Sequence, residues 1–484
     1  MVLLIVVSGS VYSLQGMNTI LGRDNAIFLY AGEQFADGVP PYVSIFENKG
    51  PMPSFLAGWS ISLARPLGIE PIYVVRAAFL LLSSMSVAAL FLLAFNLFHS
   101  RSIGLLSALT FLTFLGFGRF ACAGPRAKTP MVLFQILALT LMVRRSWFWA
   151  SFCGALACLV WQPAGIFVIA PIVLSYLQST RGRERVDAVR RALLGGAFPF
   201  ALTAAYYAIK GNLLDAVYGF GLFNFVYLSR EARDWHEGIV NPLRAIYIKD
   251  PATAPILVAG FIAMLALYVV RVRGQNGSIA RTLKEDAFAG VLLTFPIPII
   301  WSYFDFQKYP DAFVFLPYLV VAFAWGAWCA VGALVSTLGR GRGLRMAILA
   351  VLAVASVGTS ASRYVAVGDQ GLLVQQRQAK EIRAMVSPGT ALLAIGSPQI
   401  HAILNEANLT RYGIMIVGMG AYIDDKEPGG FEGWLERIES QKPPLVIHGY
   451  TSGLQATKLR TWIQNHYREI DVGFPFFSVF QRLE

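Results

Sequence analysis

The stretch from 22 to 53 holds the side chains best suited to chemistry in this chain. Charged residues make up only 14% of the 484 residues. This stretch nevertheless contains six of them: Arg23, Asp24, Glu33, Asp37, Glu47 and Lys49. It lies between two apolar segments, and charge beside a bilayer is costly, so the cluster indicates a functional site.

Lys49 lies just before a predicted apolar helix over 54–64, which Pro51 and Pro53 are expected to start. A lysine at this position adds to the positive end of the helix dipole. The ammonium and the free backbone N–H groups together suit a phosphate. The competing interpretation is a lysine that extends to the membrane interface.

Asp24 precedes an amphipathic pattern that predicts a helix over 25–37. Gly38 is expected to cap the C-terminus of this helix, and Pro40-Pro41 to end it. Such a helix is expected to lie on the membrane surface rather than cross it. Asp24 is then a helix N-cap, a functional carboxylate, or both.

The composition predicts a mainly α-helical, polytopic integral membrane protein. Hydrophobic residues make up 56% of the chain, and the net charge is +12. In a membrane protein this charge reflects arginine-rich cytoplasmic loops rather than binding to nucleic acid. The four cysteines show no disulfide or metal pattern, and the five histidines are scattered without ligand spacing. We therefore predict no metal site and no cofactor.

Eleven apolar segments are candidate membrane spans by length. They lie at about 1–15, 71–97, 102–118, 130–143, 146–161, 163–178, 192–209, 252–270, 287–303, 311–336 and 346–361. Alternate loops are short and rich in arginine, which places them in the cytoplasm. The other loops, 16–70, 119–129, 210–251 and 304–310, hold most of the acidic residues and are expected outside.

The tail from 363 to 484 is predicted to be a small extracytoplasmic α/β domain. Strands are expected at 391–395, 445–448 and 476–483, with helices at 431–440 and 454–466. No glycine-rich phosphate loop opens any of its helices, so nucleotide binding is not supported. Residues 1–362 then form the transmembrane module, with 16–70 as its first outer loop.

The first outer loop carries an ordered series of motifs. Asp24 and the helix are followed by Gly38-Val39-Pro40-Pro41-Tyr42, then Phe46, then Lys49-Gly50-Pro51. Weaker motifs follow along most of the chain: Val75-Arg76-Ala77, Trp161-Gln162-Pro163, Phe223-Asn224 to Tyr227, Tyr309 to Pro317, and Ile395-Gly396-Ser397-Pro398-Gln399. In this order they resemble the GT-C superfamily of membrane glycosyltransferases. The resemblance is to bacterial protein O-mannosyltransferase-like enzymes and to the aminoarabinose transferase of lipid A.

The resemblance implies inverting transfer of a sugar from a polyprenyl-phosphate donor to a hydroxyl of a glycan, lipid or protein acceptor. The reaction would occur at the outer face of a bacterial-type inner membrane. Asp24 matches the catalytic acidic position and would act as general base. Lys49 matches the position that meets the lipid phosphate. Asn25, Tyr42, Glu47 and Asn48 are expected to contact the substrates.

The sequence departs from the family pattern at several positions. Asn25 stands where many relatives carry a second acid, and Gly50 where they often carry proline. Arg126 and Lys128 replace an acid of the second outer loop and are either phosphate contacts or interfacial anchors. Asp311, after Lys308-Tyr309-Pro310, is either a helix cap or a substrate contact. Glu231, Asp234, His236 and Glu237 form either a solvated face or acceptor contacts.

Two other functions are open at this stage. A transporter or flippase would show inverted repeats and charges near the middle of the membrane, and neither is evident. A non-catalytic scaffold with an outer binding domain would not need Asp24 and Lys49 close together. The distance between these two side chains therefore helps to separate a scaffold from an enzyme.

Overall fold

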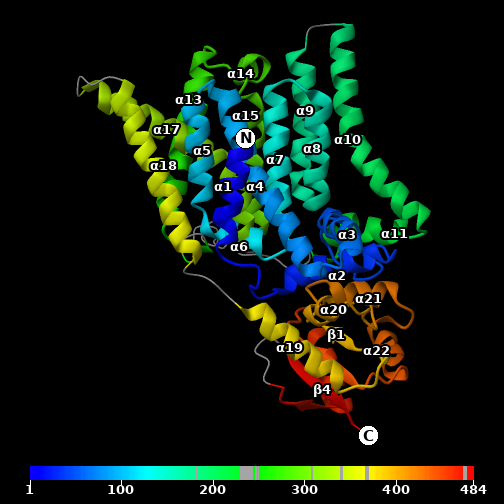
Figure 1. Ribbon diagram of the computed structural model, residues 1–484. Coiled ribbons are helices and arrows are strands. Elements are labelled where there is room, and N and C mark those ends of the chain that lie inside the picture. The colour runs from blue at the N-terminus through cyan, green and yellow to red at the C-terminus, as the bar shows by residue number, and fades with distance from the viewer. Residues whose placement is uncertain are drawn as a thin grey trace.

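The computed structural model describes residues 1–179, 182–228, 244–245, 248, 250–306, 309–337, 342–365, 370–472 and 477–483. A bundle of helices stands above a smaller C-terminal domain, and two short helices, α2 and α3, lie between them (Figure 1). The predicted mainly α-helical architecture is confirmed.

The bundle and the helices beneath it account for most of the described chain. The α-helices are Val2–Ser13 (α1), Arg23–Ala36 (α2), Met52–Ala64 (α3), Pro71–Phe98 (α4), Arg101–Leu112 (α5), Leu115–Cys122 (α6), Lys128–Val143 (α7), Trp147–Val160 (α8), Ile166–Gln178 (α9), Arg183–Ile209 (α10), Leu213–Ala216 (α11), Ala254–Gly274 (α13), Ile279–Glu285 (α14), Ala289–Thr294 (α15), Pro296–Asp305 (α16), Leu316–Thr337 (α17) and Arg342–Val365 (α18). Short 3₁₀ segments, Arg65–Leu67, Gln162–Gly165 and Tyr309–Phe315, and π-helical segments, Val217–Leu222 and Asn224–Leu228, join some of them.

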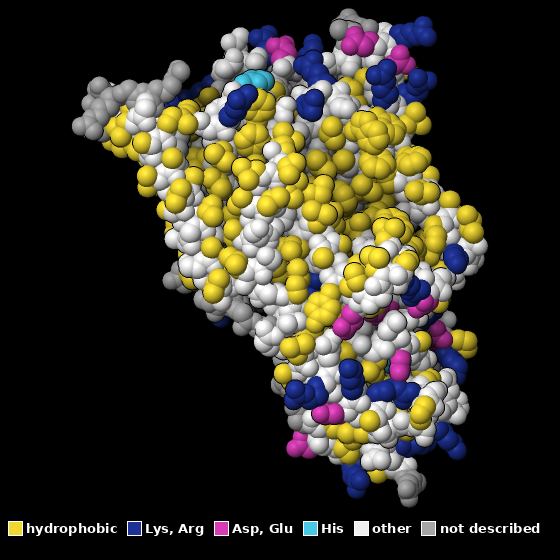
Figure 2. All heavy atoms as spheres, in the orientation of Figure 1, with side chains coloured by type: hydrophobic (Ala, Val, Ile, Leu, Met, Phe, Trp, Pro, Cys, Tyr) yellow, Lys and Arg dark blue, Asp and Glu magenta, His cyan; other side chains and the backbone are white. Residues whose placement is uncertain are grey.

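The chain is a multi-pass membrane protein with several long apolar helices. Within the described residues, five helical segments are long and apolar enough to cross a membrane: Pro71–Phe98, Arg183–Ile209, Ala254–Gly274, Tyr309–Thr337 and Gly343–Val365. A sixth results if α5 and α6, which are bent by 68° at their break, count as one span. Apolar side chains cover the visible face of the bundle between its two ends (Figure 2).

Each of the eleven predicted segments contains a helix, although some boundaries differ. α10, which contains the predicted span 192–209, begins earlier than this span, at Arg183. Its first turns are polar and extend the helix past the apolar region. The predicted span 102–118 falls on two helices, since α5 ends at Leu112 and α6 begins at Leu115.

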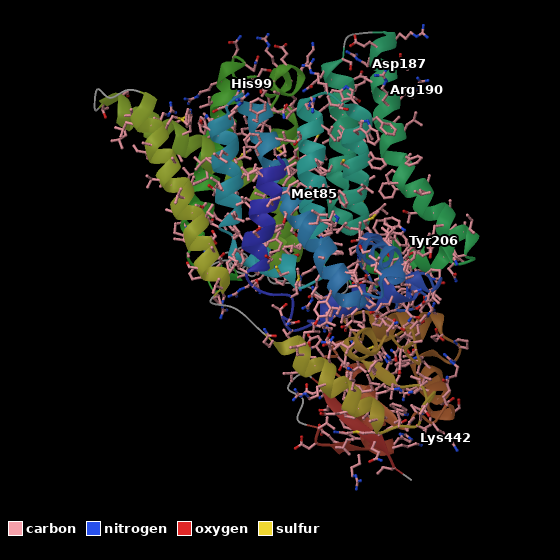
Figure 3. The ribbon with its side chains drawn as sticks, in the orientation of Figure 1. Met85, His99, Asp187, Arg190, Tyr206 and Lys442 are labelled. Carbon is pink, nitrogen blue, oxygen red and sulfur yellow. The ribbon has the colours of Figure 1, made fainter. Side chains whose placement is uncertain are left out.

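Lys and Arg gather at the end of the bundle that is farthest from the C-terminal domain (Figure 2). Asp187 and Arg190 lie at this end, together with His99, whereas Tyr206 lies at the opposite end near α3 (Figure 3). Several loops that the sequence predicts to be basic therefore meet at one end of the molecule. The C-terminal domain and α2 lie at the other end.

α2 and α3 form a tightly packed pair. A Cβ atom added at Gly32 would lie 2.6 Å from the Cβ atom of Ala57, so only glycine permits this approach. Gly38 has a φ of +91° and donates its N–H to Phe35 O, which confirms the predicted C-terminal cap. α2 lies between the bundle and the C-terminal domain (Figure 1), and its predicted position on the membrane surface stays a prediction. Residues Asn25 to Gln34 are buried, because α2 packs against α3 on one side and the C-terminal domain on another.

The C-terminal domain has a four-stranded mixed sheet in the order β1-β2-β4-β3. β1 (Leu393–Ile395) is parallel to β2 (Leu445–His448), whereas β4 (Ser478–Arg482) is antiparallel to both β2 and β3 (Tyr467–Ile470). The helices are Gly371–Ala384 (α19), Gln399–Leu404 (α20), Met419–Lys426 (α21), Gly430–Ser440 (α22) and Ala456–His466 (α23). The predicted small α/β domain is thus present, with β3 as an additional strand. No sequence pattern predicts β3, because it follows α23 without a turn and its central residues, Arg468 and Glu469, are exposed.

Candidate active site

Asp24 lies in the first turn of α2, where the helix dipole favours a negative charge. The interpretation of Asp24 as the N-cap is wrong, because Gly22 occupies that position and no side chain caps the helix. The carboxylate instead pairs with two guanidinium groups. Arg126 Nη2 lies 3.3 Å from Asp24 Oδ2, and Arg23 Nη2 lies 3.6 Å from Oδ1. The Asp24 side chain remains 26% exposed, so a substrate can still reach it.

Arg126 enters from the second outer loop and fixes the start of α2. Its Nη1 donates to Asn25 Oδ1, while Asn25 Nδ2 donates to Pro125 O at 3.1 Å. Its guanidinium lies 4.0 Å above the ring of Phe120, and burial lowers the pKa of Arg126. The interpretation of Arg126 as an interfacial anchor is therefore wrong.

The same contacts explain Asn25, the first departure from the family pattern. Its amide accepts a hydrogen bond from Arg126 and donates one to Pro125 O. An ionised aspartate can only accept, so it could not make the second bond. Asn25 therefore joins the first and second outer loops in a way that a second acid could not.

Lys49 lies on the same side of α2 as Asp24. Its Nζ atom is 5.4 Å from the centre of the Phe28 ring, and Phe28 is fully buried. Residues four apart on a helix share a face, so Phe28 places Lys49 one turn along from Asp24. The contact with Phe28 draws the ammonium group of Lys49 toward α2, and its extension to the membrane interface stays an open alternative.

Three polar side chains hold the loop that carries Lys49. The Tyr42 hydroxyl donates to Lys49 O at 2.6 Å, and Tyr42 itself has a positive φ of 68°. Gln162 donates to Asn48 O at 2.9 Å, and Asn224 donates to the same oxygen at 3.0 Å. Asn48 also donates to Asn224 Oδ1. The loop is thus fixed by α8–α9 and by the π-helical segment.

Gln162 and Asn224 were not singled out as site residues, although both stand in motifs that matched the family pattern. Their function is a backbone contact across more than a hundred residues, which no local pattern predicts. The predicted substrate contacts of Tyr42 and Asn48 stay predictions. In the structure Tyr42 donates to Lys49 O within the loop, and Asn48 donates to Asn224 of the π-helical segment.

Close packing around Gly50 explains the second departure from the family pattern, the glycine that stands where relatives often carry proline. A Cβ atom at this position would lie 1.8 Å from Leu159 O, so the loop backbone lies directly against the end of α8. We expect Gly50→Ala to lower the free energy of unfolding by about 1–3 kcal/mol, as overpacking does. Thermal unfolding in detergent measures this. Gly358→Ala is the matched control, since nothing lies within 4 Å of its added Cβ, and an unchanged Tm for Gly50→Ala would contradict the prediction.

Lys128 and Asp311 form a second ion pair beside the first. Lys128 Nζ lies 3.2 Å from Asp311 Oδ1 and 3.3 Å from the centre of the Trp161 ring. The Lys128 side chain is only 10% exposed, so its interpretation as an interfacial anchor is wrong. The negative charge of Asp311 also raises the pKa of Arg126, against the effect of burial. Charges of both signs therefore alternate from Arg23 to Lys128 along one side of the site.

Glu47 is the most unusual carboxyl group near Asp24 and Lys49. It is buried, with 5% of its surface exposed, and lies in the loop outside the membrane-spanning helices. Burial raises the pKa of Glu47 from 4.5 to about 7, the charge of Lys49 opposes this, and the charge of Asp24 adds to it. The charges of Asp24 and Lys49 thus both affect the pKa of the Glu47 carboxyl group.

The pKa of Glu47 predicts how stability depends on pH. Between pH 4.5 and about 7 the folded state holds a proton that the unfolded state has lost. The contribution of this proton to the free energy of unfolding is therefore fully present below pH 4.5. It is lost as the pH rises through 7, by about 3 kcal/mol in total. Apparent Tm between pH 4.5 and 8 measures this. Burial also raises the pKa of Glu33, so part of the slope comes from that group. Glu47→Gln should remove the part that Glu47 contributes, and an equal slope in that variant would contradict the assignment.

Metal-ligating side chains do not gather at this site. No group of three or more His, Cys, Asp or Glu side chains could hold a metal ion anywhere in the described part of the chain. Glu231, Asp234, His236, Glu237 and Lys308 lie outside the described residues. The predictions for them, and the predicted lack of a metal, stay predictions.

The structure resembles solved membrane glycosyltransferases along its whole length. ArnT from Cupriavidus metallidurans in the apo state matches with a TM-score of 0.60 at 14% identity, over 100% of this chain and 97% of that one. The chain has the GT-C fold. ArnT bound to undecaprenyl phosphate matches with a TM-score of 0.57 at 14% identity, over 100% of this chain and 98% of that one.

A third GT-C structure is the Archaeoglobus fulgidus oligosaccharyltransferase in complex with zinc and sulfate. It matches with a TM-score of 0.55 at 12% identity, over 98% of this chain and 72% of that one. No protein-family model and no curated protein sequence matches the chain. The low identities mean that the likeness is one of fold.

Proposed function

We propose that the protein is an inverting glycosyltransferase that uses a polyprenyl-phosphate sugar as donor. The observation that carries the proposal is that Lys49 lies against Phe28, which follows Asp24 by one turn of α2, and that both charges act on the buried carboxyl group of Glu47. A scaffold has no need of a carboxylate and an ammonium group near the same turn of a helix. The GT-C fold, the first outer loop and its ordered motifs support the same conclusion.

The proposed reaction balances with these two residues. Asp24 takes the proton of an acceptor hydroxyl while that oxygen attacks the anomeric carbon from the side opposite the phosphate. The bond between the anomeric carbon and the phosphate oxygen breaks, and its electron pair leaves with the polyprenyl phosphate. Lys49 stabilises the charge that develops on this phosphate. Arg126 and Lys128 are further candidates for contacts to the phosphate.

Two solved GT-C structures support a lipid-phosphate donor. ArnT was crystallised with undecaprenyl phosphate, and the archaeal oligosaccharyltransferase AglB is in complex with a dolichol-phosphate and an inhibitory peptide. A single phosphate carries less charge than a pyrophosphate, so one lysine suffices to meet it. We propose no metal in the reaction.

We place the site at the outer face of a bacterial-type inner membrane. Lys and Arg gather at the end of the bundle farthest from the C-terminal domain (Figure 2), and short loops rich in Lys and Arg favour the cytoplasmic side. The C-terminal domain, α2 and Lys49 then lie outside.

The experiment uses the full chain in lipid nanodiscs with a panel of polyprenyl-phosphate sugars. Release of polyprenyl phosphate together with a glycosylated acceptor supports the proposal. Movement of the intact lipid-linked sugar between leaflets without its cleavage would identify a flippase instead. If neither release nor movement is observed, a non-catalytic scaffold remains as the function.

A further inference from the structure

The C-terminal domain brings an exposed aromatic ring close to Asp24. The guanidinium carbon of Arg23 lies 4.7 Å from the centre of the Tyr450 ring. Arg23 also lies 3.6 Å from Asp24 through Nη2. One guanidinium thus joins the carboxylate of the membrane module to a tyrosine of the outer domain.

Tyr450 is 61% exposed although Arg23 lies against its ring. Its backbone, by contrast, is firmly held. Gly449 donates its N–H to Ile395 O at 2.8 Å, and Ser452 donates to Met415 O at 2.9 Å. Gly396, with a φ of +75°, has no room for a Cβ, because it would lie 2.4 Å from Tyr450 O. A fixed backbone under an exposed ring is suited to binding.

The position of Tyr450 in the fold also favours a role in binding. It follows β2, and Gly396 follows β1, so both lie at the carboxyl ends of the two parallel strands. In α/β sheets, ligands bind outside the carboxyl ends of parallel strands. Here that end of the sheet contributes the loop that contacts Arg23.

On these grounds, and resting on the proposed function, we propose that Tyr450 and Arg23 form the acceptor subsite, and that the acceptor presents a sugar ring. The C–H face of a sugar packs flat on an aromatic ring, and its hydroxyls accept hydrogen bonds from a guanidinium. A sugar held on Tyr450 has a hydroxyl within reach of Asp24.

A peptide acceptor fits this end of the domain less well. Extended peptides commonly add to the open edge of a sheet. The edge strand β1 is closed here, since Ala394 bonds through both its N–H and its carbonyl to the side chain of Asn408. The residues of β1 are also buried. A saccharide needs no strand edge.

The test compares two acceptors of similar tail length, octyl glucoside and 1-octanol, together with a serine-containing peptide. The donor is the polyprenyl-phosphate sugar that the wild type turns over fastest. Tyr450→Leu should raise the KM for octyl glucoside roughly five- to tenfold, with KM for 1-octanol unchanged. Tyr450→Phe, which keeps the ring, should stay within about twofold of wild type.

Tyr176→Leu is the matched control. Tyr176 is 55% exposed and carries Arg185 at 4.7 Å, the same arrangement at the arginine-rich end of the bundle. This variant should leave every KM unchanged. An equal effect of Tyr450→Leu on both alcohols, an effect on the peptide alone, or no effect at all overturns the inference. If the wild type releases no polyprenyl phosphate with any donor and acceptor, the proposed function fails first.

Discussion

Replacing Asp24 by asparagine is expected to lower sugar transfer by about 10²–10⁴-fold, the usual contribution of a general base. Asparagine keeps the size of the side chain but cannot take up the acceptor proton. Expression and membrane insertion should be unchanged, because the carboxylate is partly exposed and packs in no apolar core. Initial rates of polyprenyl phosphate release at saturating donor measure the loss.

Asp37→Asn is the matched control for this variant. Asp37 belongs to the same outer loop and also pairs with an arginine, with its Oδ1 2.5 Å from Arg65 Nη2. It lies at the far end of α2, so its removal should change the rate by less than about twofold, in line with the small worth of an exposed ion pair. Full activity of Asp24→Asn would contradict the assigned role. An equal loss in both variants would point to a damaged loop rather than a missing base.

Local signals explain why much of the first outer loop could be predicted. Gly38 ends α2 as expected, because a positive φ favours glycine there. Pro51 and Pro53 open α3, since proline fits the first turn of a helix. Each of these features depends on a few neighbouring residues. The apolar spans depend only on length and composition.

Contacts between distant parts of the chain could not be predicted in this way. Asp24 is held by Arg126, about a hundred residues away, and the Lys49 loop is held by Gln162 and Asn224. The contact of Arg126 with the donor phosphate stays a prediction, and no local pattern predicts its pairing with Asp24. α2 was expected on a lipid surface because its pattern is amphipathic, and no pattern shows that the C-terminal domain covers it.

The C-terminal domain also fixes the loop that carries Lys49. The ring of Phe46 stacks on Tyr422 with 4.3 Å between their centres and 20° between their planes. Phe46 donates its N–H to Arg411 O at 2.8 Å, while the Arg411 side chain pairs with Asp215. Phe46 is only three residues before Lys49. The C-terminal domain therefore helps to set the position of the ammonium group as well as carrying Tyr450.

Replacing Lys49 by alanine is expected to lower kcat/KM for the donor by about 10²–10³-fold, as the loss of one charge-stabilising group does at an active site. The ammonium acts on the departing phosphate, so the KM for the acceptor should stay unchanged. Rates at varied donor concentration measure the loss, and added ethylammonium should restore part of it. Lys210→Ala is the matched control, because Lys210 also contacts this loop, through Gly38 O at 3.0 Å, but at its far side. A Lys49→Ala variant that changes only acceptor use would contradict the phosphate role. It would leave Arg126 and Lys128 as the groups that meet the donor, since they lie beside Asp24 and Asp311.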